Sequence, residues 1–101
     1  MPAREIFESL ETHADPDRIA GIDHTYVFDI EGEGRWLVAL RDGKLTVTEG
    51  WTEGADVVIS TSSGTFARLA SGEQNPMTAY MTGKLKVDGD LGAALKLQKL
   101  F

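Results

Sequence analysis

NPMTAYMTGKLKVDGDLGAALKLQKLF, residues 75–101, is the stretch that decides the fold, because it predicts a helix, a strand and a second helix in close succession. Asn75 is a favourable N-cap, and Pro76 suits the first helical position, where its missing N–H is no loss. Polar and apolar residues alternate over 84–87, which is typical of a half-buried strand. Asp90 is placed to cap the last helix.

The last predicted helix is apolar around well over half of its circumference. A helix that packs one face on a core needs a narrower apolar stripe. The helix therefore packs on two sides, lines an apolar space, or forms a subunit interface, and the sequence leaves these three alternatives open. Its apolar residues are Leu91, Ala93, Ala94, Leu95, Leu97, Leu100 and Phe101.

Composition narrows the class of protein. A chain of 101 residues is long enough to bury its own core, so we expect one domain, 1–101. The chain has no cysteine, which excludes disulfides and thiolate chemistry and fits a reducing compartment. A net charge of −6 without a Lys/Arg cluster disfavours nucleic acid as a partner. No apolar run approaches the roughly 18 residues of a membrane span, so we expect no stable membrane insertion and a cytoplasmic location.

Upstream of residue 75 the pattern predicts two helices and four strands. Residues 3–14 have helical periodicity, and a second helix begins after the capping residue Ser62. Between them the period is two, and Asp42-Gly43 predicts a tight hairpin. We therefore predict an antiparallel meander with one apolar face. The inward residues are Tyr26, Phe28, Ile30, Trp36, Val38, Leu40, Leu45, Val47, Val57 and Ile59.

The other face of this sheet is polar except for a small apolar patch. Exposed apolar patches are found at subunit interfaces, so the patch is a candidate surface for a homodimer. Its residues are Val27, Leu37, Ala39 and Val58.

Residues with catalytic chemistry are sparse. His13 and His24 have no neighbouring carboxylate and nucleophile in the sequence, and we interpret both as surface histidines. Asp88 and Asp90 flank a glycine without the spacing of a calcium loop, so a turn and a helix cap explain them. We predict no enzyme activity, no metal and no cofactor.

Residues 80–90, YMTGKLKVDGD, resemble the C-terminal signature of the sterol carrier protein type two family. The likeness extends upstream over nearly the whole chain, through Phe28-Asp29-Ile30, Asp42-Gly43, Ala55-Asp56 and the segment 70–76. The resemblance implies an α+β fold. Its five-stranded, mainly antiparallel sheet has one face covered by helices, with an apolar tunnel between them.

The same resemblance implies a non-catalytic lipid carrier. Its ligand is a fatty acid, a fatty acyl-CoA, an isoprenoid or a sterol-like compound. The chain ends at Phe101, without the family's extra C-terminal segment, which favours a compact prokaryotic member with a fatty-acid-like or isoprenoid ligand. One alternative is an accessory module that presents lipid to a lipid-metabolising partner enzyme. Another is a small dimer that uses the apolar patch described above.

Periodicity and resemblance together predict the tunnel walls. Met77 and Met81 are notable because an unbranched thioether repacks easily around ligands of different shape. We therefore expect Met81→Glu to abolish lipid uptake. The predicted wall residues are Trp36, Val38, Leu40, Phe66, Leu69, Met77, Tyr80, Met81, Leu91, Leu95 and Leu97.

Overall fold

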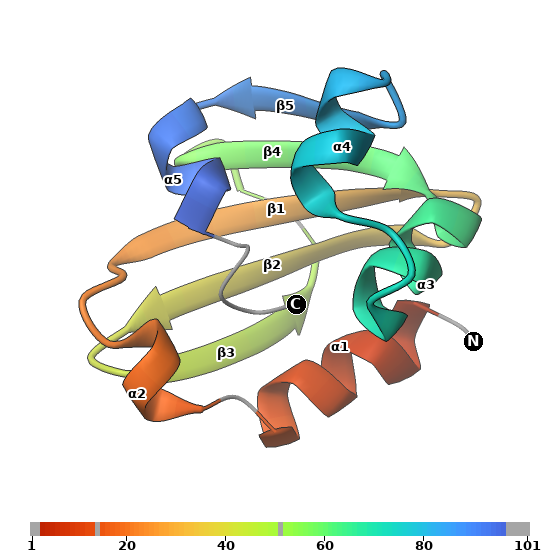
Figure 1. The fold of residues 1–101 in the computed structure, drawn as a ribbon. Coiled ribbons are helices and arrows are strands. Elements are labelled where there is room, and N and C mark those ends of the chain that lie inside the picture. The colour runs from red at the N-terminus through yellow and green to blue at the C-terminus, as the bar shows by residue number, and fades with distance from the viewer. Residues whose placement is uncertain (1–2, 14, 51, 97–101) are drawn as a thin grey trace.

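The computed structural model describes residues 3–13, 15–50 and 52–96, and shows a five-stranded sheet with helices on one face (Figure 1). The predicted α+β class is confirmed. Its strands are β1 (His24–Glu31), β2 (Gly34–Arg41), β3 (Lys44–Glu49), β4 (Val57–Ser62) and β5 (Leu85–Gly89). Its helices are α1 (Ala3–His13), α2 (Pro16–Ile19), α3 (Ser63–Ser71), α4 (Pro76–Met81) and α5 (Leu91–Leu95).

The strand order β3-β2-β1-β4-β5 shows that the predicted meander is wrong. β1, β2 and β3 are antiparallel neighbours, as their short turns require. β4, however, pairs with β1, and the pair is parallel; β5 then lies antiparallel on the outer side of β4. Parallel strands need a crossover instead of a tight turn. The loose segment between β3 and β4 makes that crossover.

Local signals for turns and helix starts are confirmed. Asp42 and Gly43 have φ angles of 53° and 74°, the positive values that both central positions of a type I′ hairpin require. Ser62, Asn75 and Asp90 each accept a hydrogen bond from a backbone N–H in the first turn of α3, α4 and α5. The described helices are short, and none of them has the length and apolarity that crossing a membrane takes.

An aromatic cluster fills the core beneath α1 and α3. Phe7 of α1 stacks on Trp36 of β2 and on Phe66 of α3, with ring centroids 4.9 Å and 4.8 Å apart. Phe28 of β1 meets the edge of Phe7 at 5.4 Å. All four side chains are buried. Offset and edge-to-face ring pairs add to the stabilisation from burial alone, so this cluster fixes α1 and α3 on the sheet.

The second face of the sheet is partly covered by the chain itself. Val27, a member of the predicted dimer patch, is fully buried, and Leu37, Ala39 and Val58 are half-buried. The crossover between β3 and β4 runs behind β1 and β2 in Figure 1, on the side away from the helices. Its last residue, Asp56, donates its N–H to the Thr25 carbonyl oxygen. A homodimer through this face stays a prediction, with less free apolar surface than the sequence indicated.

Gly89 allows β5 to approach β4 closely. Its φ is +123°, and a Cβ at this position would overlap the Asp56 carbonyl oxygen and lie 3.1 Å from the Val57 Cα. We expect Gly89→Ala to lower the free energy of unfolding by about 2 kcal/mol or more, because backbone strain and overpacking add. Gly72→Ala is the control, since Gly72 also has positive φ but no atom within 4 Å of an added Cβ. Equal losses in urea titrations of both variants would contradict the close approach.

Candidate functional site

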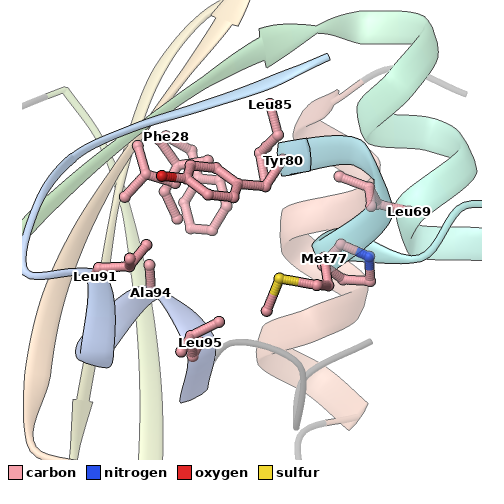
Figure 2. Close-up of a pocket in the computed structure, with 11 residues that line it drawn as sticks. Phe28, Leu69, Met77, Tyr80, Leu85, Leu91, Ala94 and Leu95 are labelled. Atoms are coloured by element: carbon pink, nitrogen blue, oxygen red, sulfur yellow. The ribbon is translucent and has the colours of Figure 1, made fainter. Parts of the chain in front are cut away.

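An apolar cavity lies between the sheet and helices α4 and α5 (Figure 2). Apart from the hydroxyl of Tyr80, every side chain in its lining is apolar. Such a surface can hold hydrocarbon, and it offers no set of polar groups to bind a compact polar substrate. Eleven residues form the lining: Phe28, Ile59, Leu69, Pro76, Met77, Tyr80, Leu85, Val87, Leu91, Ala94 and Leu95.

The floor of the cavity is a row of side chains across three strands. Phe28 of β1 is in register with Ile59 of β4, and Ile59 is in register with Val87 of β5. Leu85, two residues before Val87, points to the same face because side chains alternate along a strand. The parallel pairing of β1 with β4 is what brings these residues together.

The walls of the cavity come from α4, which precedes β5 in the chain, and from α5, which follows it. α4 contributes Met77 and Tyr80, which are three residues apart and therefore share one helix face. α5 contributes Leu91 and Leu95 by the same rule. Figure 2 shows the α4 side chains pointing across the cavity toward those of α5. Leu69 of α3 closes the remaining side.

The cavity is small in this conformation, with a volume of about 40 Å³. Pockets for small molecules usually measure about 300–1,000 Å³. A small-molecule ligand of ordinary size therefore fits only when α4 and α5 move outward. These helices have only six and five residues, and short elements with few packed neighbours are the parts of a protein that open most easily.

A buried hydrogen bond holds α5 on the sheet. The Tyr26 hydroxyl donates to the Ala93 carbonyl oxygen over 2.7 Å, and both residues are buried. Burial, with the negative charges of Asp56 and Asp90, raises the pKa of Tyr26 to about 12. The hydroxyl therefore stays protonated and donates throughout the physiological pH range.

An exposed polar cluster lies where β1, β4 and α5 meet. The Asp56 Oδ2 atom accepts the Thr25 N–H at 2.9 Å and lies 3.4 Å from the His24 Nδ1 atom. The Lys96 ammonium lies 3.3 Å from the other ring nitrogen of His24. The hydrogen bond from the Thr25 N–H and, to a smaller extent, the contact with His24 hold the pKa of Asp56 below its ordinary value. His24, which the sequence indicated as a surface histidine, is half-buried and has Asp56 beside it, because the parallel β1–β4 pair brings the two together.

The described residues contain no cluster of side chains that could bind a metal ion. Within residues 3–13, 15–50 and 52–96, no three His, Asp or Glu side chains gather closely enough to hold a metal ion.

Comparison with known proteins places this fold in a family. The model of the SCP-2 sterol transfer family matches residues 4–101. The chain belongs to this family. The resemblance stated from residues 80–90 is confirmed.

Relatives of this chain are much longer proteins. Hydroxysteroid dehydrogenase-like protein 2 of Xenopus tropicalis is 38% identical over 102 residues, which cover 98% of this chain and 24% of that protein. Human sterol carrier protein 2 is 36% identical over 101 residues, covering 96% of this chain and 18% of that protein. The chain thus spans about a quarter or less of the length of these relatives.

A solved structure supports the fold independently. The inverting sec-alkylsulfatase Pisa1 from Pseudomonas sp. contains a region similar to this chain, with a TM-score of 0.88 and 26% identity. The match covers 100% of this chain and 16% of that enzyme. In this solved enzyme too, the sterol-carrier fold is one part of a larger protein.

Five residues predicted as walls lie together in the cavity. They are Leu69, Met77, Tyr80, Leu91 and Leu95. Leu97 lies outside the described residues. The ligand-binding role of these residues stays a prediction.

The other predicted wall residues lie elsewhere. Trp36, Val38, Leu40 and Phe66 are buried in the core, and Trp36 and Phe66 stack on Phe7 instead of lining the cavity. Met81 is the last residue of α4, and its side chain is 78% exposed. The cavity lies over β1, β4 and β5, and β2, which carries Trp36, Val38 and Leu40, contributes no residue to its lining.

Six lining residues were missing from the prediction. The period-two pattern already identified two of the floor residues, Phe28 and Ile59, as inward-facing. What the sequence lacked was the strand order, which decides the helix above each inward residue. The six are Phe28, Ile59, Pro76, Leu85, Val87 and Ala94.

Removing the Tyr26 hydroxyl tests the attachment of α5. We expect Tyr26→Phe to lower the free energy of unfolding by about 1 kcal/mol and to speed amide exchange in α5, because the Ala93 carbonyl loses its donor. Tyr80→Phe is the matched control, since the Tyr80 hydroxyl makes no hydrogen bond within the described residues and the side chain is partly exposed. Unchanged exchange in α5 of a folded Tyr26→Phe variant would contradict this role.

The charge of Asp56 should stabilise the fold in a pH-dependent way. Its pKa is lowered on folding, so its contribution is present above the ordinary carboxyl pKa and is lost as pH falls through the lowered value. We expect Asp56→Asn to be less stable at pH 7 by less than about 1 kcal/mol, since the carboxylate is exposed. Urea titrations of both proteins should converge in acid. A difference that does not change with pH would rule out the charge as its cause.

Proposed function

We propose that this domain binds the hydrocarbon chain of a lipid in the cavity between α4, α5 and strands β4 and β5, and carries or presents that lipid without catalysing a reaction. A fatty acid, a fatty-acyl compound or an isoprenoid fits this description. The observation that carries the proposal is the lining, which is apolar throughout except for one hydroxyl. Membership of a lipid-transfer family supports the same conclusion.

Burial of the chain supplies the affinity. Each buried methylene contributes about 0.8 kcal/mol, so ten methylenes give roughly 8 kcal/mol before the losses of freedom on binding. Widening the cavity from its volume of about 40 Å³ costs free energy and lowers the net binding energy further. The expected dissociation constant is about micromolar or weaker, which allows release as well as uptake.

The polar end of the ligand belongs at the mouth of the cavity. The inner surface has no charged group to pair with a carboxylate or a phosphate, and burying an unpaired charge there would be unfavourable. Tyr80 lines the cavity and is 39% exposed, so its hydroxyl can reach both the ligand and solvent. We assign it the head group, with the chain extending toward Phe28.

A second role is presentation of the lipid to an enzyme. The relatives in which this domain is found are far longer, and their names denote a dehydrogenase-like protein and an alkylsulfatase. By analogy with these longer relatives, our proposal is that this domain supplies a bound lipid to a catalytic domain or partner enzyme. The absence of cysteine fits the cytoplasm as the compartment where this takes place.

The two methionines of α4 provide a paired test. Met77 lines the cavity, whereas Met81 is exposed, although both belong to one short helix. We expect Met77→Glu to weaken uptake of a fluorescent fatty acid at least tenfold, because a carboxylate would have to be buried against hydrocarbon. Met81→Glu should bind like the unmodified protein, contrary to the expectation from the sequence.

The outcome separates the alternatives. Equal loss in both variants would move the ligand from the cavity to the outer side of α4. If the unmodified protein takes up no fluorescent fatty acid and carries no lipid in native mass spectra, a carrier role is excluded and a protein-interaction role remains.

A further inference from the structure

The two edges of the sheet differ in how they are protected. On the β3 edge, the Glu11 carboxylate of α1 accepts the Val47 N–H at 2.6 Å. Arg4 of α1 also forms an ion pair with Glu49 at the end of β3. Side chains of α1 therefore occupy this edge, and an added strand would have to displace them. Unprotected edges, in contrast, present free N–H and C=O groups to any further strand.

Among the described residues, no side chain bonds to the backbone of the β5 edge in this way. β5 pairs with β4 in an unbroken register from Gly89 to Leu85, without a bulge and without proline. In the part of the chain that the structure describes, only β4 forms hydrogen bonds with the backbone of residues 85–89. Every second residue of a strand directs its N–H and C=O to the outer side. The strand therefore offers a regular, unpaired row of backbone groups.

Exposed apolar side chains lie beside this edge. Among the described residues, the large apolar side chains that are exposed all belong to α4 and α5, the helices that flank β5 in Figure 1. They are Tyr80 (39%), Met81 (78%), Leu91 (44%) and Leu95 (41%). Apolar patches that are not used in the core of a monomer mark interaction surfaces. Tyr80, Leu91 and Leu95 also line the cavity, so Met81 is the one of these four that is exposed outside it, on the helix that precedes the open strand.

The charges on β5 complement a second copy of the same strand. Lys86 and Asp88 flank Val87 and are both exposed. An antiparallel pair centred on Val87 places Lys86 opposite Asp88 of the partner subunit, and this contact occurs twice by symmetry. Opposite charges on directly facing residues stabilise a strand pair, and like charges destabilise it. An in-register parallel pair would put like charges next to each other, so the pattern selects the antiparallel arrangement.

We propose that two copies of this domain associate through their β5 edges, in a two-fold dimer that joins the two sheets into one continuous sheet. α4 precedes β5 and α5 follows it, so the two-fold axis brings α4 of one copy next to α5 of the other. Met81 is then covered by the partner, and so is Leu91. The two lipid cavities, whose floors include Val87, lie side by side on the same face.

The first measurement is the mass of the protein in solution as a function of its concentration. The interface is small, so association is weak and reversible. Sedimentation equilibrium of the chain should show a mass that rises from 11.0 kDa toward twice that value as concentration increases. A mass that stays at 11.0 kDa up to the solubility limit overturns the proposal.

Charge exchange at β5 tests the register. Lys86→Asp and Asp88→Lys each create two like-charge contacts, and each should weaken self-association about tenfold or more. Combining both substitutions in one chain restores the opposite-charge contacts and should restore the dimer. An equimolar mixture of the two single variants should form a heterodimer for the same reason. If neither single variant changes the dissociation constant, or if the double variant stays monomeric, the β5 edge is not the interface.

Two control variants distinguish the β5 edge from the rest of the surface. Leu37→Glu changes the face of the sheet that the sequence indicated as a dimer surface, and it should leave association through β5 unchanged. Met81→Glu should weaken the dimer while fatty-acid uptake persists, which keeps this proposal distinguishable from the lipid-binding one. Loss of the dimer in Leu37→Glu, or binding of a monomer to phosphatidylcholine–phosphatidylserine vesicles through Met81, would overturn it.

Discussion

The parallel hydrogen bonding between β1 and β4 is the constraint on which the rest of the structure depends. It puts β1 at the centre of the sheet and leaves the outer side of β4 for β5. Because α4, β5 and α5 follow one another with short connections, they must all pack on that half of the sheet. The cavity, the Tyr26 hydrogen bond to α5 and the contact of His24 with Asp56 all follow from this single pairing.

The sheet is consequently divided into two halves with different packing. Over β1 and β2, Phe7 stacks on both Trp36 and Phe66, with ring centroids 4.9 Å and 4.8 Å apart. Over β4 and β5, two short helices face each other across a cavity. Phe28 belongs to both halves, since it meets Phe7 in the cluster and also lines the cavity. The proposed binding of a lipid therefore concerns the β4–β5 half, while the stacked rings lie over the other half.

The same division explains the two functions assigned to α4. Its inner residues, Met77 and Tyr80, face the cavity, where an adaptable thioether and one hydroxyl suit a lipid chain and its head group. Its last residue, Met81, is exposed, and β5 follows α4 directly in the chain. One six-residue helix thus connects the lipid site with the proposed subunit contact, and a change in the position of α4 would affect both.

What the sequence alone determined is local. Period-two and helical patterns, the caps at Ser62, Asn75 and Asp90 and the Asp42-Gly43 hairpin predict nearly every element, because each depends on neighbours within a few residues. Periodicity, together with the family resemblance, also predicted part of the cavity lining, as Met77, Tyr80, Leu91 and Leu95 show. Only the tertiary structure decided that β4 lies beside β1, and therefore that Phe28 and Val87, rather than Val38 and Leu40, form the cavity floor. Alternation reveals which face a side chain occupies, whereas strand partners are chosen by long-range pairing that many inward apolar residues could satisfy equally well.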